Sequence, residues 1–255
     1  EAQAGYDRAV ANEISAENLL DNTREALREI TGEYIDMLSP LSDAMTLVEP
    51  NPNEIETWTK ISSEQNLKII AAKHALESAR QEIKIQRAGH FPTLDLVANH
   101  GFNSTGGRFG GTTIQSDAIG LELNVPIYQG GLINSQTREA QQQYNAAREQ
   151  LERQYRAAQR QTREAYRGVI SGISQVHALK QALISTETAL QATQAGFEVG
   201  TRTAVDVVAS ERATLEAKRD YARARYNYIG DSLELKRAAG TLSPEDLQQL
   251  NNWLE

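Results

Sequence analysis

The feature that most constrains the fold is a stretch of some sixty residues, from about Asn134 to Gly196, that contains no proline and no cluster of turn-forming residues. At a rise of 1.5 Å per residue, this stretch predicts one helix of roughly 90 Å. Helices in globular proteins average three to four turns. A helix of this length therefore needs neighbouring helices along its whole course.

A heptad pattern supplies contacts for those neighbours. The apolar positions that recur every seven residues are Val169, Val176, Leu183, Leu190 and Phe197, flanked by Ala165, Gly172, Leu179, Thr186 and Thr193. A further row of small residues beside them comprises Ala182, Ala189 and Gly196. Two adjacent rows predict a helix that packs on both sides, as in a sheet or barrel of helices.

The helical pattern breaks at residues 199–203 and then resumes until about Gly240. Residues 3–32 can be laid over residues 211–240, and both segments end as helices closed by a glycine, Gly32 or Gly240. If this similarity is a duplication, we expect the chain to hold the end of one copy and the whole of the next. The break is then the turn of an antiparallel helix pair.

The six prolines divide the remainder of the chain, because proline interrupts helix interiors. Residues 33–58 read as an irregular segment with short helices. A helical pattern returns from about Glu54 and ends before Phe91-Pro92.

Between Thr93 and Tyr128 the hydrophobic period changes to two, which predicts a strand hairpin. The apolar face of the second strand is Ile119, Leu121, Leu123, Val125 and Ile127, and its polar face includes Glu122 and Asn124. The first strand places Leu94, Leu96, Ala98 and Phe102 opposite Asp95, Asn99 and Asn103. Runs of about ten residues match membrane β-strands, and a soluble hairpin is the alternative.

The connection between these strands is rich in glycine, serine and threonine. Its Gly-Gly-Arg-Phe-Gly-Gly sequence (residues 106–111) is interpreted as a flexible loop rather than a phosphate cradle, because no Lys-Ser/Thr follows it and no helix begins there.

Charge and composition argue against several classes of function. The net charge of −8 argues against a general affinity for nucleic acid or for anionic lipid. The arginine-rich residues 148–167 are therefore interpreted as a solvated helix face with Glu149–Arg153 and Glu152–Arg156 pairs. There is no cysteine, no apolar run of about 18 residues and no visible signal peptide. The four histidines are scattered without a catalytic or metal-binding motif. We therefore expect no enzyme, no metal and no cofactor.

Four separated motifs carry a resemblance to a known family. "GHFPTLDL", "VPIYQGGLINSQ", "FEVGTRTAVDV" and "ARARYNY", in this order and spacing, resemble the TolC-type outer-membrane efflux proteins of Gram-negative bacteria. That family implies a homotrimer in which each subunit has two tandem repeats. Its β-strands form a barrel in the outer membrane, and its long helices form an α-helical tunnel through the periplasm.

The resemblance implies an assignment for each part of the chain. Residues 1–32 would end the tunnel helix of the first repeat, and 33–58 would be equatorial. Residues 59–91 would be a tunnel helix, and 92–129 the barrel hairpin with an extracellular loop at 103–118. Residues 130–240 would form the periplasmic helical hairpin with its tip at 199–203, and 241–255 an equatorial tail. The apolar strand face would contact outer-membrane lipid, and Glu122 and Asn124 would face the lumen.

In this family the helix tips converge to close the tunnel and open when a periplasmic adaptor and an inner-membrane transporter dock. The resemblance implies a gate formed by Phe197, Gly200, Thr201, Arg202, Thr203 and Asp206. Arg202 would hold the latch and Asp206 would line the constriction. Favourable helix-end electrostatics is the alternative role for both.

Two positions depart from the family pattern. Phe197 stands where a latch tyrosine is expected, and Ala209 where a second lining aspartate is expected. The latch should be weaker or built differently, and the cation preference of the constriction should be lower. The alternative function is a soluble helical interaction protein that binds partner helices through its heptads.

Overall fold

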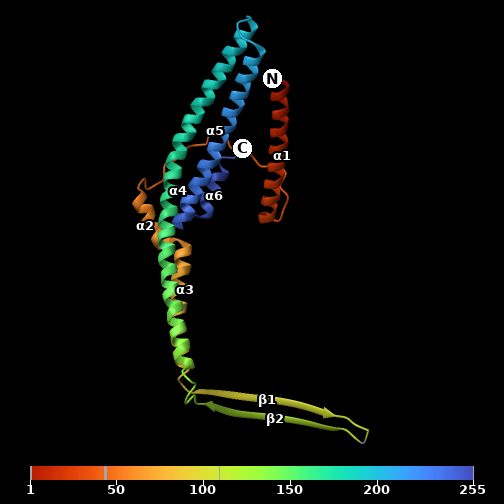
Figure 1. Cartoon of the computed structure of the whole chain (residues 1–255), viewed down its shortest axis with the longest axis vertical. Helices are drawn as coiled ribbons and strands as arrows, with labels where there is room; N and C mark the ends of the chain where they lie inside the picture. Colours follow the sequence, from red (N-terminus) through yellow and green to blue (C-terminus); the bar gives the residue numbers. More distant parts are fainter. Residues whose placement is uncertain (1, 43–44, 109, 255) are drawn as a thin grey trace. The chain divides into compact units, whose positions relative to one another are not determined.

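The computed structural model describes residues 2–42, 45–108 and 110–254 of the chain (Figure 1). Its elements in chain order are α1 (Ala2–Thr31), α2 (Ile55–Gln65), α3 (Leu67–Ala88), β1 (Thr93–Thr105), β2 (Thr112–Asn124), α4 (Leu132–Glu198), α5 (Ala204–Ala239) and α6 (Pro244–Asn251). The predicted fold class, mainly helical with one β-hairpin, is confirmed. The chain divides into two compact units, residues 1–62 with 159–255 and residues 63–158.

Helix α4 is the long helix that the proline-free stretch predicts, with 67 residues. The predicted break lies between α4 and α5, which run antiparallel (Figure 1). Two of the flanking heptad threonines link the helices: Thr193 Oγ1 accepts from Ser210 Oγ at 3.3 Å, and the carbonyl of Thr186 accepts from Thr214 Oγ1 at 3.2 Å. Polar contacts thus take over from apolar ones toward the turn.

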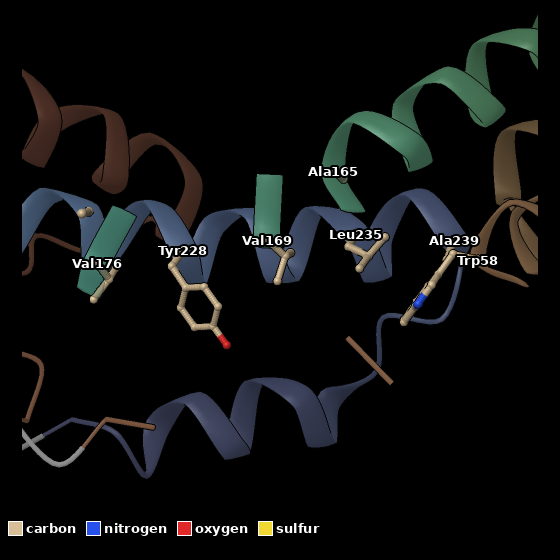
Figure 2. Packing of buried hydrophobic residues seen from close by; sticks show 8 residues of the cluster. Trp58, Ala165, Val169, Val176, Tyr228, Leu235 and Ala239 are labelled. Atoms are coloured by element: carbon tan, nitrogen blue, oxygen red, sulfur yellow. The ribbon is translucent and has the colours of Figure 1, made fainter. Parts of the chain in front are cut away.

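The buried core of the first unit lies at the other end of this helix pair (Figure 2). It comprises Trp58, Ala165, Val169, Val176, Ala224, Tyr228, Leu235 and Ala239. Gly172 lies against Tyr228 of this core, since a Cβ at this position would lie 3.6 Å from Tyr228 Cβ, an ordinary contact distance. The heptad prediction is therefore confirmed at Val169 and Val176, whereas Phe197 at the end of the same row is 49 % exposed.

Side chains of this core hold the segment before α2 by its main chain. The hydroxyl of Tyr228 donates to the carbonyl of Val48 and accepts from its N–H, both at 2.8 Å. Arg225 is buried and donates to the carbonyls of Leu41 and Ser42. Trp58 Nε1 donates to the carbonyl of Pro52 at 2.7 Å. These bonds hold the main chain at Leu41, Ser42, Val48 and Pro52 in the absence of regular secondary structure.

Within the predicted irregular segment 33–58, the described residues before Ile55 contain no helix, and helix α2 begins at Ile55. Pro40, Pro50 and Pro52 interrupt this segment at short intervals, and proline disfavours helix interiors. The segment instead forms an isolated antiparallel bridge from Leu41 to Leu254. Helix α6 follows Ser243, whose N–H donates to Asp246 Oδ2 at 2.9 Å, and Asp246 also pairs with Lys236.

The helix expected from about Glu54 to Gly89 is two helices, which corrects the prediction. Asn66 lies between α2 and α3, and its side chain accepts from the N–H groups of Lys68 and Ile69. An asparagine cap of this kind starts a new helix, and the apolar period alone does not reveal it. In the second unit, Lys73 lies 5.6 Å from the ring centroid of Tyr155, so α3 and the first part of α4 are in contact.

The arginine-rich part of α4 is mostly paired with acids or amides. The Glu152–Arg156 pair has the expected i, i+4 spacing at 3.4 Å, but Glu149 pairs with Arg148, and Arg153 bonds to Gln150. The predicted Glu149–Arg153 pair is therefore wrong. The side chain of Arg153 donates to the amide oxygen of Gln150, one turn away, rather than to the carboxylate of Glu149.

The β-hairpin extends further than the sequence pattern predicts. The ladder runs from Thr93↔Asn124 to Thr105↔Thr112, so residues 103–105 and 112–118 are strand rather than loop. The connection shrinks to residues 106–111, of which Phe109 lies outside the described residues. At the other end, Val125 and Ile127 lie beyond β2, because Pro126 has no N–H for the ladder and β1 starts only at Thr93.

Helix α1 has no buried side chain among residues 5–31. Its exposed apolar side chains include Tyr6, Ile14, Leu19, Leu20 and Ile30. In the described residues, none of the helices is both long and apolar enough to span a membrane.

Candidate functional site

The turn between α4 and α5 is closed by one main-chain oxygen. The carbonyl of Gly196 accepts from Thr201 N at 2.8 Å, Arg202 N at 3.1 Å and Thr201 Oγ1 at 2.9 Å. Gly200 has φ of +79°, a left-handed conformation that glycine adopts without steric cost. The predicted glycine break is therefore a helix end with reversed backbone at Gly200.

Thr203 and Asp206 cap the start of α5 reciprocally. The N–H of Asp206 donates to Thr203 Oγ1 at 3.2 Å, and the N–H of Thr203 donates to Asp206 Oδ2 at 2.8 Å. The hydroxyl of Thr203 also donates to Asp206 Oδ2. These bonds from Thr203, with a smaller contribution from the charge of Arg202, lower the pKa of the Asp206 carboxyl. Asp206 is thus a capping residue that stays charged at neutral pH.

Arg202 differs from its neighbours because only its stem is held. A Cβ added at Gly196 would lie 2.8 Å from Arg202 Cγ, so the stem of the arginine crosses the helix directly over this glycine. Among the described residues, its guanidinium has no hydrogen-bond or ion-pair partner. The backbone is fixed while the charged group is available for a contact outside the chain.

Exposed apolar side chains lie on both sides of Arg202 in the sequence. Phe197 is 49 % exposed, and the others that project near the turn are Val199, Val205 and Val208. Val205 and Val208 of α5 were not predicted as part of this site. Their i, i+3 spacing, with one on each side of Asp206 in the sequence, is the signal that could have identified them.

The β-hairpin separates its side chains onto two faces as predicted. Register pairs Leu94 with Leu123, Leu96 with Leu121 and Ala98 with Ile119 on one face. The other face pairs Thr93 with Asn124 and Asp95 with Glu122. Two carboxylates directly opposite each other repel, so this face favours water or a cation. Their pairing was not apparent until the register was known.

The structure does not bring the turn residues and the hairpin faces into one site. They belong to different compact units, with residues 197–206 in the first and residues 93–124 in the second. No group of three or more His, Asp or Glu side chains that could hold a metal ion occurs among the described residues.

Comparison with known proteins assigns the family. The sequence model described as "Outer membrane efflux protein" matches residues 58–241, which include α3, both strands, α4 and α5. The chain belongs to this outer membrane efflux protein family.

Relatives in the family cover almost the whole chain. It is 38 % identical to Outer membrane protein TolC of Escherichia coli strain K12 over 264 residues, which are 99 % of this chain and 53 % of that protein. It is 28 % identical to the Proteases secretion protein PrtF of Dickeya chrysanthemi, over 100 % of this chain and 56 % of that protein. The chain thus spans about half the length of the curated relatives that it matches.

Two solved structures share the fold at low sequence identity. CusC matches with a TM-score of 0.66 and 19 % identity over 89 % of this chain and 53 % of that one. VceC of Vibrio cholerae matches with a TM-score of 0.64 and 20 % identity over 91 % of this chain and 56 % of that one. The relatives named here are described as membrane or secretion proteins and not as enzymes, in agreement with the sequence-based expectation.

Proposed function

We propose that this chain is part of an outer-membrane channel, a passive exit duct for efflux or type I secretion. The family and the relatives support this function, since TolC is an outer membrane protein and PrtF a protease secretion protein. The location would be the outer membrane of a Gram-negative bacterium, with the helices in the periplasm. The partners would be two further copies of the subunit, a periplasmic adaptor and an inner-membrane transporter, with no nucleic acid, cofactor or catalytic role.

The β-hairpin supports the membrane part of this proposal. Every residue of β2 is exposed, and in β1 only Val97 and Gly101 are half-buried. Leu121 is 72 % exposed and Ile119 81 % exposed on the same face. Lipid would cover this face, extended by Val125 and Ile127, while Glu122 and Asn124 would face a watery lumen. Strands of 13 residues are long enough to cross the hydrocarbon layer at a tilt.

The helix turn supports the gating part. The observation that carries it is the guanidinium of Arg202, which has no hydrogen-bond or ion-pair partner among the described residues, on a backbone fixed by the Gly196 carbonyl. In a ring of tips, such a group can reach a carboxylate or carbonyl of a neighbouring helix. Asp206 would add a negative charge to the constriction, but its carboxylate is already engaged by Thr203. Arg202 is therefore the stronger candidate for the latch.

Phe197 changes how this latch can be held. It occupies the end of the heptad row without a hydroxyl, so it contributes apolar contact rather than a hydrogen bond. Together with Val199, Val205 and Val208 it would give the closed tip an apolar component. The remaining proposed gate residues, Gly200, Thr201 and Thr203, set the shape of the turn.

The gating proposal is tested with Arg202→Ser in the full-length trimer in planar bilayers. We expect a higher single-channel conductance, because a charge-assisted contact worth about 1.5–3 kcal/mol is lost. Arg212→Ser is the matched control, since Arg212 already pairs with Glu216 on its own helix at 3.0 Å. Equal conductance of Arg202→Ser, Arg212→Ser and the unchanged protein would remove Arg202 from the latch.

The channel itself is tested by the mass and detergent requirement of the full-length protein. A detergent-dependent trimer is the expected result. A monomer that stays in solution without detergent would favour the alternative, a helical interaction protein that binds partner helices through its heptads.

A further inference from the structure

One polar pair interrupts the apolar face of the β-hairpin. His100 and Asp117 are directly opposite each other in the ladder, on the face that also carries the Leu96–Leu121 pair. His100 Nδ1 and Asp117 Oδ1 are in hydrogen-bond contact, and the two side chains are 63 % and 72 % exposed. The neighbouring pairs on this face are Ala98 with Ile119 and Phe102 with Gln115, so no other titratable group faces the pair.

The remaining charged side chains of the hairpin lie elsewhere. Asp95 and Glu122 pair on the opposite face, and Arg108 is in the connection between the strands. The scattered histidines of the sequence gave no reason to single out His100. Only the ladder register brings it against Asp117.

The position of the pair along the strand matches an edge of the membrane. On this face the pair separates the apolar pairs, from Leu94–Leu123 to Ala98–Ile119, from Gln115, Ser104 and Thr113, which lie nearer the connection. The apolar band on the lipid side of outer-membrane barrels is about 25 Å tall and ends at the interfaces with water. A charged group costs about 2–4 kcal/mol at the midplane of that band but about 0–1 kcal/mol near its edges. The pair therefore fits the head-group level.

The geometry leaves one ring nitrogen for a ligand. Nδ1 of His100 is engaged by Asp117, so Nε2 is the ring nitrogen left for a ligand. In the neutral ring with a proton on Nδ1, Nε2 is an acceptor and cannot bind a phosphate oxygen. A second proton converts Nε2 into a donor and makes the net charge of the pair zero, which also suits a medium of low dielectric constant.

We propose that the His100–Asp117 pair binds the phosphate of an anionic lipid head group through Nε2–H of the protonated imidazole. The proposal rests on the proposed function, because it needs the apolar face to meet lipid. Histidine is the side chain that changes charge in mildly acidic solution, so lipid binding here depends on pH.

The test is native mass spectrometry of the full-length trimer in detergent, titrated with phosphatidylglycerol or phosphatidylcholine. The charge of phosphatidylglycerol is constant over the range used, about pH 5.5 to about pH 8, so a change in binding reports on the protein. We expect about tenfold tighter retention of phosphatidylglycerol at the lower pH, as one charge-assisted hydrogen bond would give. Phosphatidylcholine, whose head group is neutral overall, should show no such change.

Variants separate this pair from other sources of pH dependence. His100→Gln should lose the pH-dependent gain, and His100→Lys should retain phosphatidylglycerol at both pH values. His74→Gln, an exposed histidine of α3, should behave as the unchanged protein. Unchanged lipid retention in His100→Gln would overturn the proposal. So would displacement of the lipid by an equal concentration of inorganic phosphate, which would indicate a free-anion site.

The two proposals fail in different ways. If the full-length protein forms no channel in bilayers, the proposed function fails. If it forms channels and His100→Gln binds lipid as the unchanged protein does, only the head-group site fails.

Discussion

The base of the α4–α5 helix pair and the β-hairpin use apolar residues in opposite ways. At the base, Val169, Tyr228 and Leu235 are each about 2 % exposed and are covered by side chains of the same chain. On the hairpin, Leu94, Leu121 and Leu123 are each more than 60 % exposed. The base carries its own core, whereas the hairpin depends on material outside the chain.

Exposed apolar side chains therefore occur in two different settings in this chain, on the β-hairpin and at the tip of the helix pair. Isolated two-stranded hairpins are marginally stable in water, and in the proposed channel neighbouring strands and lipid would cover the β-hairpin. The tip of the helix pair lies between these extremes. Its backbone is closed within the chain by Gly196, but its apolar and charged side chains remain exposed.

The largest expected effect is on the base. Tyr228→Ala removes a buried ring and both bonds to Val48, so the free energy of unfolding should fall by about 3–5 kcal/mol. The measurement is denaturant unfolding followed by far-UV circular dichroism.

Tyr228→Phe is the matched variant, because it keeps the ring and removes only the hydroxyl. It should cost about 1–3 kcal/mol, since the N–H and C=O of Val48 lose their partner. If both variants unfold like the unchanged protein, the core at the base of the helix pair does not stabilise the chain as this comparison requires.

The second prediction concerns the hairpin. Leu121→Arg should leave helix content unchanged in the chain, because this side chain is exposed, yet reduce the amount of full-length trimer assembled in the outer membrane. The expected cost is about 2–4 kcal/mol, as for arginine at the lipid face of a barrel. Heat-resistant trimer on gels gives the readout.

Asn99→Arg provides the control on the opposite face of the same hairpin. An arginine there would face the lumen and should be tolerated. Equal assembly of Leu121→Arg and Asn99→Arg would mean that the two faces do not differ in their surroundings.

The smallest expected effect is at the tip. Thr203→Ala removes the cap of α5 and should cost about 1 kcal/mol. It should also raise the pKa of Asp206 part of the way toward its ordinary value of 3.8, because the bond from the Thr203 hydroxyl is lost while the larger contribution, from the backbone N–H of residue 203, remains. A carboxyl titration by NMR would detect the change.

The pH dependence follows from the direction of that shift. A carboxyl whose pKa is lower in the folded state stabilises the fold above its unfolded pKa, and the contribution disappears as pH falls through the folded value. In the unchanged protein the cap should therefore weaken only in acid below 3.8. Loss of the cap near neutral pH would contradict the assignment.

Sequence periodicity was informative wherever one physical pattern dominated. The absence of proline predicted α4, the break in the helical pattern at residues 199–203 predicted the turn, and period two predicted both strand faces. Periodicity did not predict features of the fold that depend on a single side chain or on strand pairing. Asn66 divides a helix by capping it, and the ladder extends through Ser104 and Thr113 despite their loop-like character.

The candidate site was predictable in part. Gly200 and Thr203 have local roles that the sequence encodes directly. Two contacts depend on how the chain folds back and could not be predicted. The stem of Arg202 covers Gly196, and His100 lies opposite Asp117. Neighbours on one helix face follow from the helical period, so the sequence alone identifies them. Cross-strand partners depend on the register of the ladder, which the period does not determine.

The bonds of Arg225 and Tyr228 have a consequence for divergence among relatives. Both side chains bind main-chain atoms, at Leu41, Ser42 and Val48, and they do not depend on the side chains of those residues. Val48 is 55 % exposed. Substitutions at these three positions can therefore accumulate without detaching the segment, whereas an insertion or deletion between Ser42 and Val48 would move the bound carbonyls out of reach.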